Sequence, residues 1–186
     1  FEELLAEYQA SNEIDNLNVA NEQNDMVEKL IHKFFHFDNS DMSGKIVAYL
    51  NLLFNDIVRF IGKDFTPLNP LMKSEYMTNY CVTQKDEGLL SFNSGVDMSK
   101  SVAIAFASRY AKEEFHEFDE YVKASIEDFL NLHNGLFNVN MSNEFSLELN
   151  LCPPEVHEEE KLTNATKIYV FPIIFPFGTI HFLMEI

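Results

Sequence analysis

The segment IEDFLNLHNG, residues 126–135, places an acid and an amide three residues apart within a stretch of helical apolar periodicity. At about 100° per residue, Asp128 and Asn131 fall on the polar side of the predicted helix, together with Ala124 and Gly135. A carboxylate attracts cations and accepts hydrogen bonds, whereas an amide both donates and accepts. Because alanine and glycine leave the backbone unshielded here, the pair could bind polar groups of a closely approaching molecule.

The same pattern also fits an ordinary surface helix. In that interpretation Asp128 and Asn131 are solvated polar residues, and Gly135 is a weak point or an early helix end. Glycine within a helix costs about 0.5–1 kcal/mol relative to alanine. A docked partner would explain that cost, and a solvated face would not. Both interpretations stay open at the level of the residues alone.

Other candidate residues favour packing over catalysis. His32 and His36 have a spacing that can bind a metal, but the glutamate of an HExxH motif is absent and Phe34 and Phe35 between them favour packing. His133 falls within the apolar arc of its helix, so we expect a core histidine bonded to a carbonyl. The chain also lacks GxSxG, GxGxxG and phosphate-loop motifs.

Composition excludes several classes of function. The chain has 186 residues, of which 46% are apolar, and a formal net charge of −17 with only 13 Lys and Arg residues. Nucleic acid binding requires clustered basic side chains, so we expect no nucleic-acid partner. Cys81 and Cys152 lack the spacing of a zinc site or a disulfide framework. Without a signal-peptide pattern at its start, the sequence is expected to be cytoplasmic.

Periodicity, turn residues and caps predict a series of helices and strands. The first is a helix that begins at about residue 44 and ends at Gly62. Two strands, 74–83 and 88–95, follow and are joined by a turn at 84–87. Next come a helix that is capped by Asp97 or Ser99 and runs to Phe115, a helix over 118–138, and a strand over 144–151.

The C-terminal segment IYVFPIIFPFGTIHFLMEI, residues 168–186, could be mistaken for a membrane span. Pro172, Pro176 and Gly178 would break a spanning helix, and the flanking residues are β-branched and aromatic. We therefore predict two antiparallel strands with a tight turn, and no membrane partner.

Charge divides the chain into two regions. Residues 1–43 hold ten acids and two lysines, and we interpret them as an acidic helical arm or linker. Residues 44–186 are predicted to form one α+β domain, because a helix followed by two strands occurs twice with another helix between. This element order indicates an internal pseudo-repeat.

Several motifs of residues 44–186 resemble those of the CheC/CheX phosphatases of bacterial chemotaxis. The segment SIEDFLNLHNG is similar to the signature of an acid, two residues, an asparagine and a later glycine, with Asp128, Asn131 and Gly135 in that register. GLLSFNSG resembles the family's strand-to-helix step, LCPPEV its proline-marked strand end, and Val170 to Gly178 its closing hairpin. The resemblance implies a pseudo-symmetric fold with an antiparallel sheet and two long helices.

The resemblance also implies an activity, which is hydrolysis of the aspartyl phosphate of a CheY-like response regulator. In that role Asn131 would position the attacking water, and Asp128 would pair with the partner's active-site lysine. No cofactor of the chain's own is implied, since the receiver supplies Mg²⁺. The family acid is usually glutamate, so Glu127, which is four residues before Asn131, is a second candidate.

The expected partner surface includes Ala124, Glu127 and Gly135 beside the acid and the amide. Two alternatives to the phosphatase stay open. The domain could be an inactive module that binds a receiver or forms a homodimer in two-component signalling, or an output domain for an upstream sensor.

Overall fold

The computed structural model describes residues 40–88 and 91–185. The chain divides into two compact units, Phe1–Phe54 and Asn55–Ile186. Most of the predicted acidic arm, including His32 and His36, lies outside the described residues. The predicted domain boundary after residue 43 therefore stays a prediction.

The first described element is one long helix, as predicted. It comprises α2 (Ser40–Asp56) and a wider π-helical turn, η1 (Ile57–Ile61). The amide of Gly62 donates to the Ile57 carbonyl at 2.9 Å, with a φ of 143° that favours glycine. The predicted helix end at Gly62 is confirmed.

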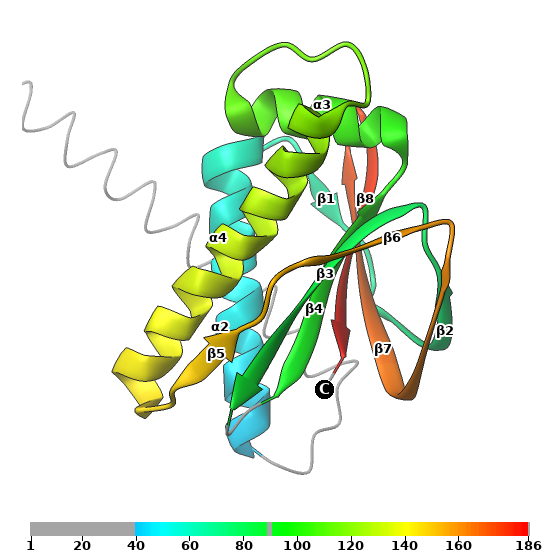
Figure 1. Ribbon diagram of the computed structural model, residues 1–186. Coiled ribbons are helices and arrows are strands. Elements are labelled where there is room, and N and C mark those ends of the chain that lie inside the picture. The colour runs from blue at the N-terminus through cyan, green and yellow to red at the C-terminus, as the bar shows by residue number, and fades with distance from the viewer. Residues whose placement is uncertain (1–39, 89–90, 186) are drawn as a thin grey trace, which may run out of the picture. The chain divides into compact units, whose positions relative to one another are not determined.

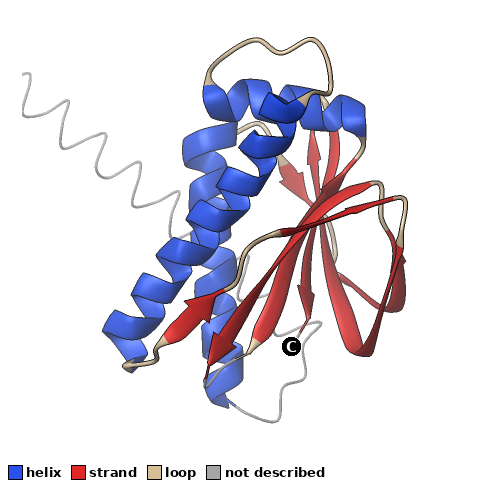
Figure 2. Ribbon diagram, in the orientation of Figure 1, coloured by secondary structure: helices blue, strands red, loops and turns tan. Residues whose placement is uncertain are grey.

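The second unit contains a curled antiparallel sheet with α3 and α4 on the same side of it (Figures 1 and 2). Six strands follow one another in the order β1-β7-β8-β4-β3-β5, while β2 pairs with β7 and β6 with β3. The strands are β1 (Thr66–Pro67), β2 (Leu71–Met77), β3 (Tyr80–Gly88), β4 (Phe92–Met98), β5 (Leu149–Leu151), β6 (Glu155–Glu158), β7 (Lys161–Phe175) and β8 (Gly178–Glu185). The helices are α3 (Lys100–Ala111) and α4 (Glu120–Phe145).

The sheet shows the predicted pseudo-symmetry in more detail. In each half of the chain a long helix precedes two strands at an edge of the sheet and then a two-stranded hairpin. The two hairpins, β3–β4 and β7–β8, meet where β4 pairs with β8. The edge strands of each half pair with the hairpin of the other half. The α+β fold class and the internal repeat are thus confirmed.

Alternation along the strands gives the sheet two packed faces. The face toward the helices makes aromatic contacts, such as Phe92 of β4 against Phe137 of α4 at 5.5 Å and Phe182 of β8 against Phe129 of α4 at 6.4 Å between ring centroids. The opposite face carries a smaller apolar cluster, which consists of Tyr76, Cys81, Ile168, Val170 and Leu183 with Leu162 packed against it.

The predicted turn at residues 84–87 is wrong. These residues continue β3, and β4 begins only at Phe92. Gln84 and Asp86 are buried on the helix side of the sheet, while Lys85 and Glu87 form an ion pair at 2.7 Å on the other side. This strand therefore carries polar side chains on both faces. The two buried ones, Gln84 and Asp86, are hydrogen-bonded to residues of α4.

Several predicted boundaries also change. The predicted strand 74–83 is divided between β2 and β3, and the predicted strand over 144–151 is reduced to β5 because α4 continues to Phe145. Ser99 caps α3, whereas Asp97 lies buried in β4 and accepts the Tyr76 hydroxyl at 2.8 Å. The helix α3 ends at Ala111, because Lys112 adopts a left-handed conformation.

The C-terminal hairpin is confirmed. Strands β7 and β8 pair from Ile168 with Glu185 to Phe175 with Gly178. The tight turn lies between Phe175 and Gly178, as predicted. Among the described residues, no helix is long and apolar enough to cross a membrane.

Candidate functional site

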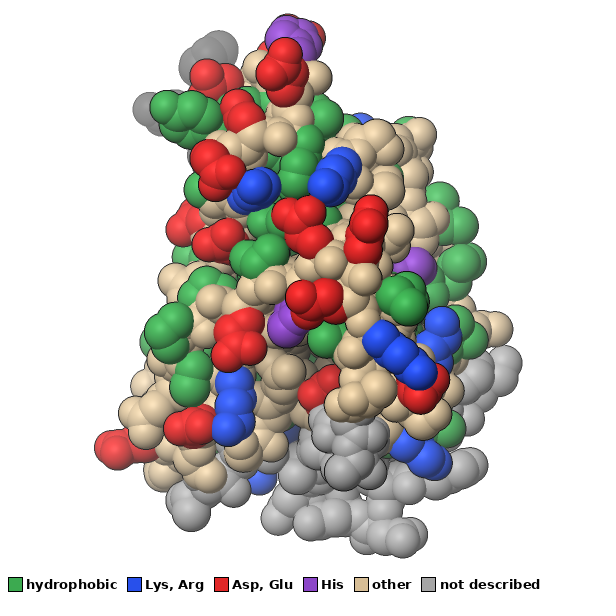
Figure 3. All heavy atoms as spheres, turned by 45° about the vertical axis from the view of Figure 1, so that its right-hand side comes forward, with side chains coloured by type: hydrophobic (Ala, Val, Ile, Leu, Met, Phe, Trp, Pro, Cys, Tyr) green, Lys and Arg blue, Asp and Glu red, His purple; other side chains and the backbone are tan. Residues whose placement is uncertain are grey.

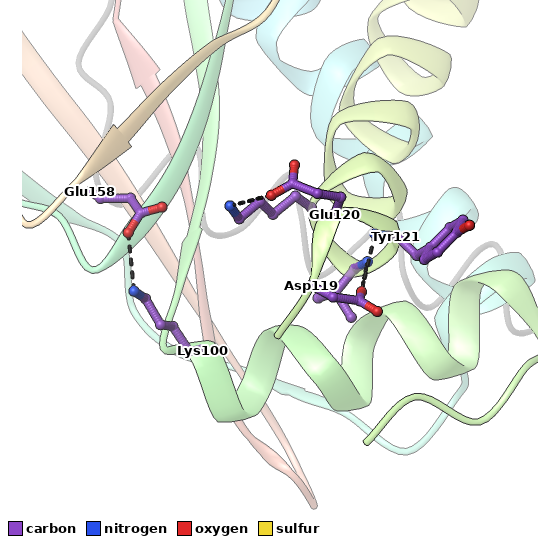
Figure 4. Close-up of polar contacts among 7 residues, drawn as sticks. Lys100, Asp119, Glu120, Tyr121 and Glu158 are labelled. Atoms are coloured by element: carbon purple, nitrogen blue, oxygen red, sulfur yellow. Dashed lines mark hydrogen bonds and ion pairs between the residues drawn. The ribbon is translucent and has the colours of Figure 1, made fainter. Parts of the chain in front are cut away.

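The helix α4 carries all the predicted site residues. It begins after Asp119, whose Oδ1 accepts the amides of Tyr121 and Val122 at 3.0 Å each (Figure 4). Its buried side chains recur at helical spacing and are Val122, Ile126, Phe129, Leu130, His133, Asn134, Phe137 and Met141. This stripe holds one side of the helix against the sheet and leaves the opposite side in solvent.

The predicted acid and amide lie on that solvent side. Asp128, Asn131 and Ala124 are exposed, whereas Glu127 and Gly135 are half-buried. An exposed strip of α4, defined by Ala124, Asp128 and Asn131, therefore runs over two turns of the helix. The first requirement of the predicted site, that both polar side chains reach solvent, is met by the geometry.

Gly135 lies inside α4, where glycine is normally unfavourable. A Cβ atom built at this position would have no described neighbour within 4 Å outside its own helical backbone. Packing within the described part of the chain therefore does not require glycine. Gly135 contrasts in this respect with Gly178, where a Cβ would collide with Val102.

Asp128 is held from the side of α3. Its Oδ2 accepts the hydroxyl proton of Tyr110 at 2.6 Å. The Tyr110 ring is itself fixed, since it packs edge-on against Phe129 at 5.7 Å and against Phe60 at 5.8 Å. Burial and the bond to Asp128 raise the pKa of Tyr110 above its usual value, so the hydroxyl remains a donor at neutral pH.

An open groove of about 600 Å³ lies beside Asp128, between the end of α3 and the first turns of α4. Its lining comprises Tyr110, Ala111, Glu113, Phe115, Tyr121, Ala124, Ser125 and Asp128. These eight residues include two carboxylates, three aromatic rings and no basic side chain. Such a lining suits a cationic side chain, which can contact both the ring faces and the carboxylates.

Asn131 is held from the other side, by β3. Its Oδ1 accepts a proton from Nε2 of Gln84 at 2.9 Å. Gln84 is only 1% exposed, and its Nε2 also donates to the Cys152 carbonyl at 2.9 Å. The exposed amide of Asn131 thus rests on a buried polar side chain.

Sequence reasoning missed two amides that continue from Asn131 along α4, of which Asn134 is buried and Asn138 half-buried. Asn134 Nδ2 donates to Gln84 Oε1 and to Ser94 Oγ, each at 2.9 Å. One turn later Asn138 Nδ2 donates to Asp86 Oδ1 at 2.6 Å. We call Asn131, Asn134 and Asn138 with Gln84 and Asp86 the amide ladder. Asparagines at positions i, i+3 and i+7 were the signal that could have indicated it.

The ladder contains a buried acid. Asp86 is fully buried, and this burial raises its pKa to about 6, although the bond from Asn138 acts in the opposite direction. Asp86 Oδ2 and Asn138 Oδ1 make no hydrogen bond within the described structure. Both ends of the Gln84 amide are therefore hydrogen-bonded, whereas one oxygen of Asp86 has no hydrogen-bond partner among the described residues.

The other polar candidates have structural surroundings. His133 is buried, as predicted, but Nδ1 bonds to Asp56 Oδ2 at 2.8 Å and not to a carbonyl. Burial lowers the pKa of His133, which favours the neutral ring. Half-buried Glu127 lies near enough to raise the pKa of Tyr80, whose shift is caused first by burial. No cluster of three metal-binding side chains occurs among residues 40–88 and 91–185.

Acidic and basic side chains lie close together on one face of the molecule. On the face shown in Figure 3, acidic side chains are spread among the Lys and Arg side chains. Surface ion pairs illustrate this mixing, with Lys100 and Glu158 at 3.0 Å (Figure 4) and Lys161 and Glu75 at 2.6 Å.

Comparison with known proteins identifies the fold. Neither a family model nor a curated protein matches the sequence. Among solved structures, the chemotaxis protein CheX from Desulfovibrio desulfuricans matches with a TM-score of 0.64 and 14% identity, over 76% of this chain and 98% of that one. A CheC-like superfamily protein from Shewanella sp. PV-4 matches with a TM-score of 0.64 and 16% identity, over 78% and 97%.

A third match is a complex of CheX with CheY, BeF3 and Mg²⁺ from Borrelia burgdorferi. It has a TM-score of 0.63 and 17% identity, and the match covers 76% of this chain and 96% of that one. Nearly the whole length of each of these proteins is thus reproduced, at low identity. The sequence motifs and the structural matches agree, and the chain has the fold of the CheC/CheX family of chemotaxis proteins.

Proposed function

We propose that this chain is a cytoplasmic phosphatase of a phosphorylated CheY-like receiver. The observation that carries the proposal is the exposed strip of α4, where Asp128 and Asn131 reach solvent on a CheC/CheX-type fold. The Borrelia burgdorferi complex supports the choice of partner, because it contains a CheX bound to a CheY.

The reaction is hydrolysis of an acyl phosphate on the receiver. A water oxygen forms a bond to phosphorus while the bond from phosphorus to the aspartyl oxygen breaks. The products are inorganic phosphate, which keeps the water's second proton or passes it to solvent, and the restored carboxylate. Asn131 would hold the water in line with the leaving oxygen through its amide, so no covalent bond to this chain is formed.

Asp128 would fix the register of docking. Its carboxylate lies at the edge of an acidic, aromatic groove, which suits a lysine side chain of the receiver. Glu127 is half-buried, so Asp128 is the more accessible of the two candidate acids. Ala124 and Gly135 would let the receiver approach the helix backbone.

Mg²⁺ is assigned to the receiver in this proposal. When bound beside the phosphoaspartate, it neutralises charge on the phosphoryl group. The role of this chain is then limited to positioning the water and the partner.

The test is the decay of a CheY-like receiver phosphorylated with acetyl phosphate, followed in Mg²⁺ with and without this chain. The proposal predicts acceleration on the order of 10²-fold, which Asn131→Ala removes. Unchanged decay at saturating concentrations of the chain would contradict the proposal.

A second function is an inactive module that binds a receiver, or dimerises, without hydrolysis. It is favoured by the Tyr110 hydroxyl, which already occupies one oxygen of Asp128, and by aspartate in place of the family's usual glutamate. Binding of the receiver with no change in its decay would support this alternative.

A further inference from the structure

We infer that Gln84 is a positioning residue, which fixes the orientation of the Asn131 amide in the site. This inference rests on the proposed function for its consequence, and its structural basis lies in the amide ladder. Gln84 is buried in the middle of β3, and its side-chain amide donates a hydrogen bond to Asn131.

The hydrogen bonds determine which end of each amide faces which neighbour. A backbone carbonyl can only accept, so the Cys152 carbonyl requires Nε2 of Gln84 on its side. The opposite end, Oε1, accepts from Nδ2 of Asn134. Gln84 therefore cannot reverse its amide without losing bonds at both ends.

This fixed orientation is passed on to Asn131. The remaining proton of Gln84 Nε2 is directed at Asn131, and the atom that can accept it is Oδ1. If the Asn131 amide turned over, two NH2 groups would face each other. Gln84 thus sets both the rotamer and the polarity of Asn131, with Nδ2 directed away from β3 and one lone pair of Oδ1 still available.

An exposed asparagine normally samples several side-chain orientations, whereas a water positioner needs one. A buried donor beneath Asn131 restricts it before the receiver arrives. The effect should therefore appear in the rate of the bound complex, kcat, and not in the concentration needed for binding, KM.

The test uses four versions of the chain: wild type, Gln84→Met, Asn131→Ala and the double variant. Methionine keeps the length of the side chain but neither donates nor accepts usefully. Ser94→Ala is the matched control, since Ser94 is equally buried on the same sheet face and bonds Asn134 but not Asn131. Thermal melting of every variant establishes that it is folded.

We expect Gln84→Met to lower kcat for receiver dephosphorylation on the order of tenfold with KM within about twofold, and Ser94→Ala to leave kcat within about twofold. In the Asn131→Ala background, Gln84→Met should have no further effect on kcat. An equal loss in both backgrounds, or equal losses for Gln84→Met and Ser94→Ala, would mean a merely structural role and overturn the inference.

A second readout does not depend on catalysis. Relaxation of the Asn131 side-chain ¹⁵N amide reports its mobility, and it should be restricted in the wild type and in Ser94→Ala but mobile in Gln84→Met. An amide that is equally mobile in all three refutes positioning by Gln84. A restricted amide in a chain without phosphatase activity would refute the proposed function alone.

Discussion

The two sides of α4 hold their exposed residues in different ways. On the side of α3, Asp128 has a single bond to Tyr110 and borders an open groove. On the side of β3, Asn131 is bonded to Gln84 within a buried network of amides. An acid that binds a partner can adapt to it, whereas an amide that positions water must be fixed in advance. In the proposed function, docking therefore belongs to the first side and chemistry to the second.

The largest expected effect of a substitution is a loss of kcat at Asn131, on the side of α4 that faces β3. Asn131→Ala should lower kcat on the order of 10²-fold, because the water is no longer held in line. Binding of a BeF3-loaded receiver should change by no more than about twofold. Titration calorimetry and phosphate release measure the two quantities. A large loss of binding would mean that the two sides do not divide the roles as proposed.

The next largest expected effect is a dependence of folding stability on pH, caused by Asp86 in the amide ladder. Its folded pKa of about 6 lies above the ordinary value of 3.8, so the folded state holds a proton that the unfolded state has released. Stability should therefore fall as pH rises from about 4 to about 6, by about 3 kcal/mol from this group. Asp86→Asn removes this contribution.

The measurement is urea unfolding at several pH values, compared between wild type and Asp86→Asn. The variant should gain stability relative to wild type as pH rises through this window, and the gain should level off above it. The introduced amide can also donate to Asn138 Oδ1, which makes no hydrogen bond in the described structure. A difference that is independent of pH would show that Asp86 titrates normally.

A smaller effect is expected on the α3 side. Asp128→Asn should raise KM about fivefold with little change in kcat, because an exposed ion pair contributes about 1 kcal/mol at most. Glu127→Gln is the matched control and should leave KM nearly unchanged. Steady-state rates at low and high salt distinguish the two variants, since Glu127→Gln keeps the Asp128 ion pair, which salt screens, and Asp128→Asn lacks it. The reverse ranking would identify Glu127 as the docking acid.

The smallest effect is expected at Gly135. Gly135→Ala should stabilise the chain by about 0.5–1 kcal/mol and yet raise KM a few-fold, since the added methyl group obstructs the receiver. Gly44→Ala is the control, because Gly44 also lies in a helix with no neighbour within 4 Å of its Cβ. It should stabilise without changing KM. Equal KM values for the two variants would show that the receiver does not approach Gly135 closely.

Local signals in the sequence predicted the fold where they determine structure directly. Glycine after the first long helix, the serine cap of α3 and the turn at Gly178 each satisfy a backbone requirement of neighbouring residues. Helical periodicity likewise placed Asp128 and Asn131 on the exposed side of α4. These features depend on contacts close in sequence, so a single chain displays them.

The amide ladder depends on contacts between distant residues, and for this reason the sequence did not display it. Gln84 and Asp86 looked like turn residues because polar side chains are usually exposed. Each is buried by a partner about 50 positions away. Their polarity could be interpreted correctly only after the pairing of β3 with α4 was known.

The most direct test of the central claim is a crystal structure of this chain with a CheY-like receiver loaded with BeF3 and Mg²⁺. The account predicts that the Asn131 amide lies within about 4 Å of the beryllofluoride, on the side where a water would attack, with its Oδ1 still bonded to Gln84. A complex in which the exposed strip of α4 faces away from the beryllofluoride would contradict the account.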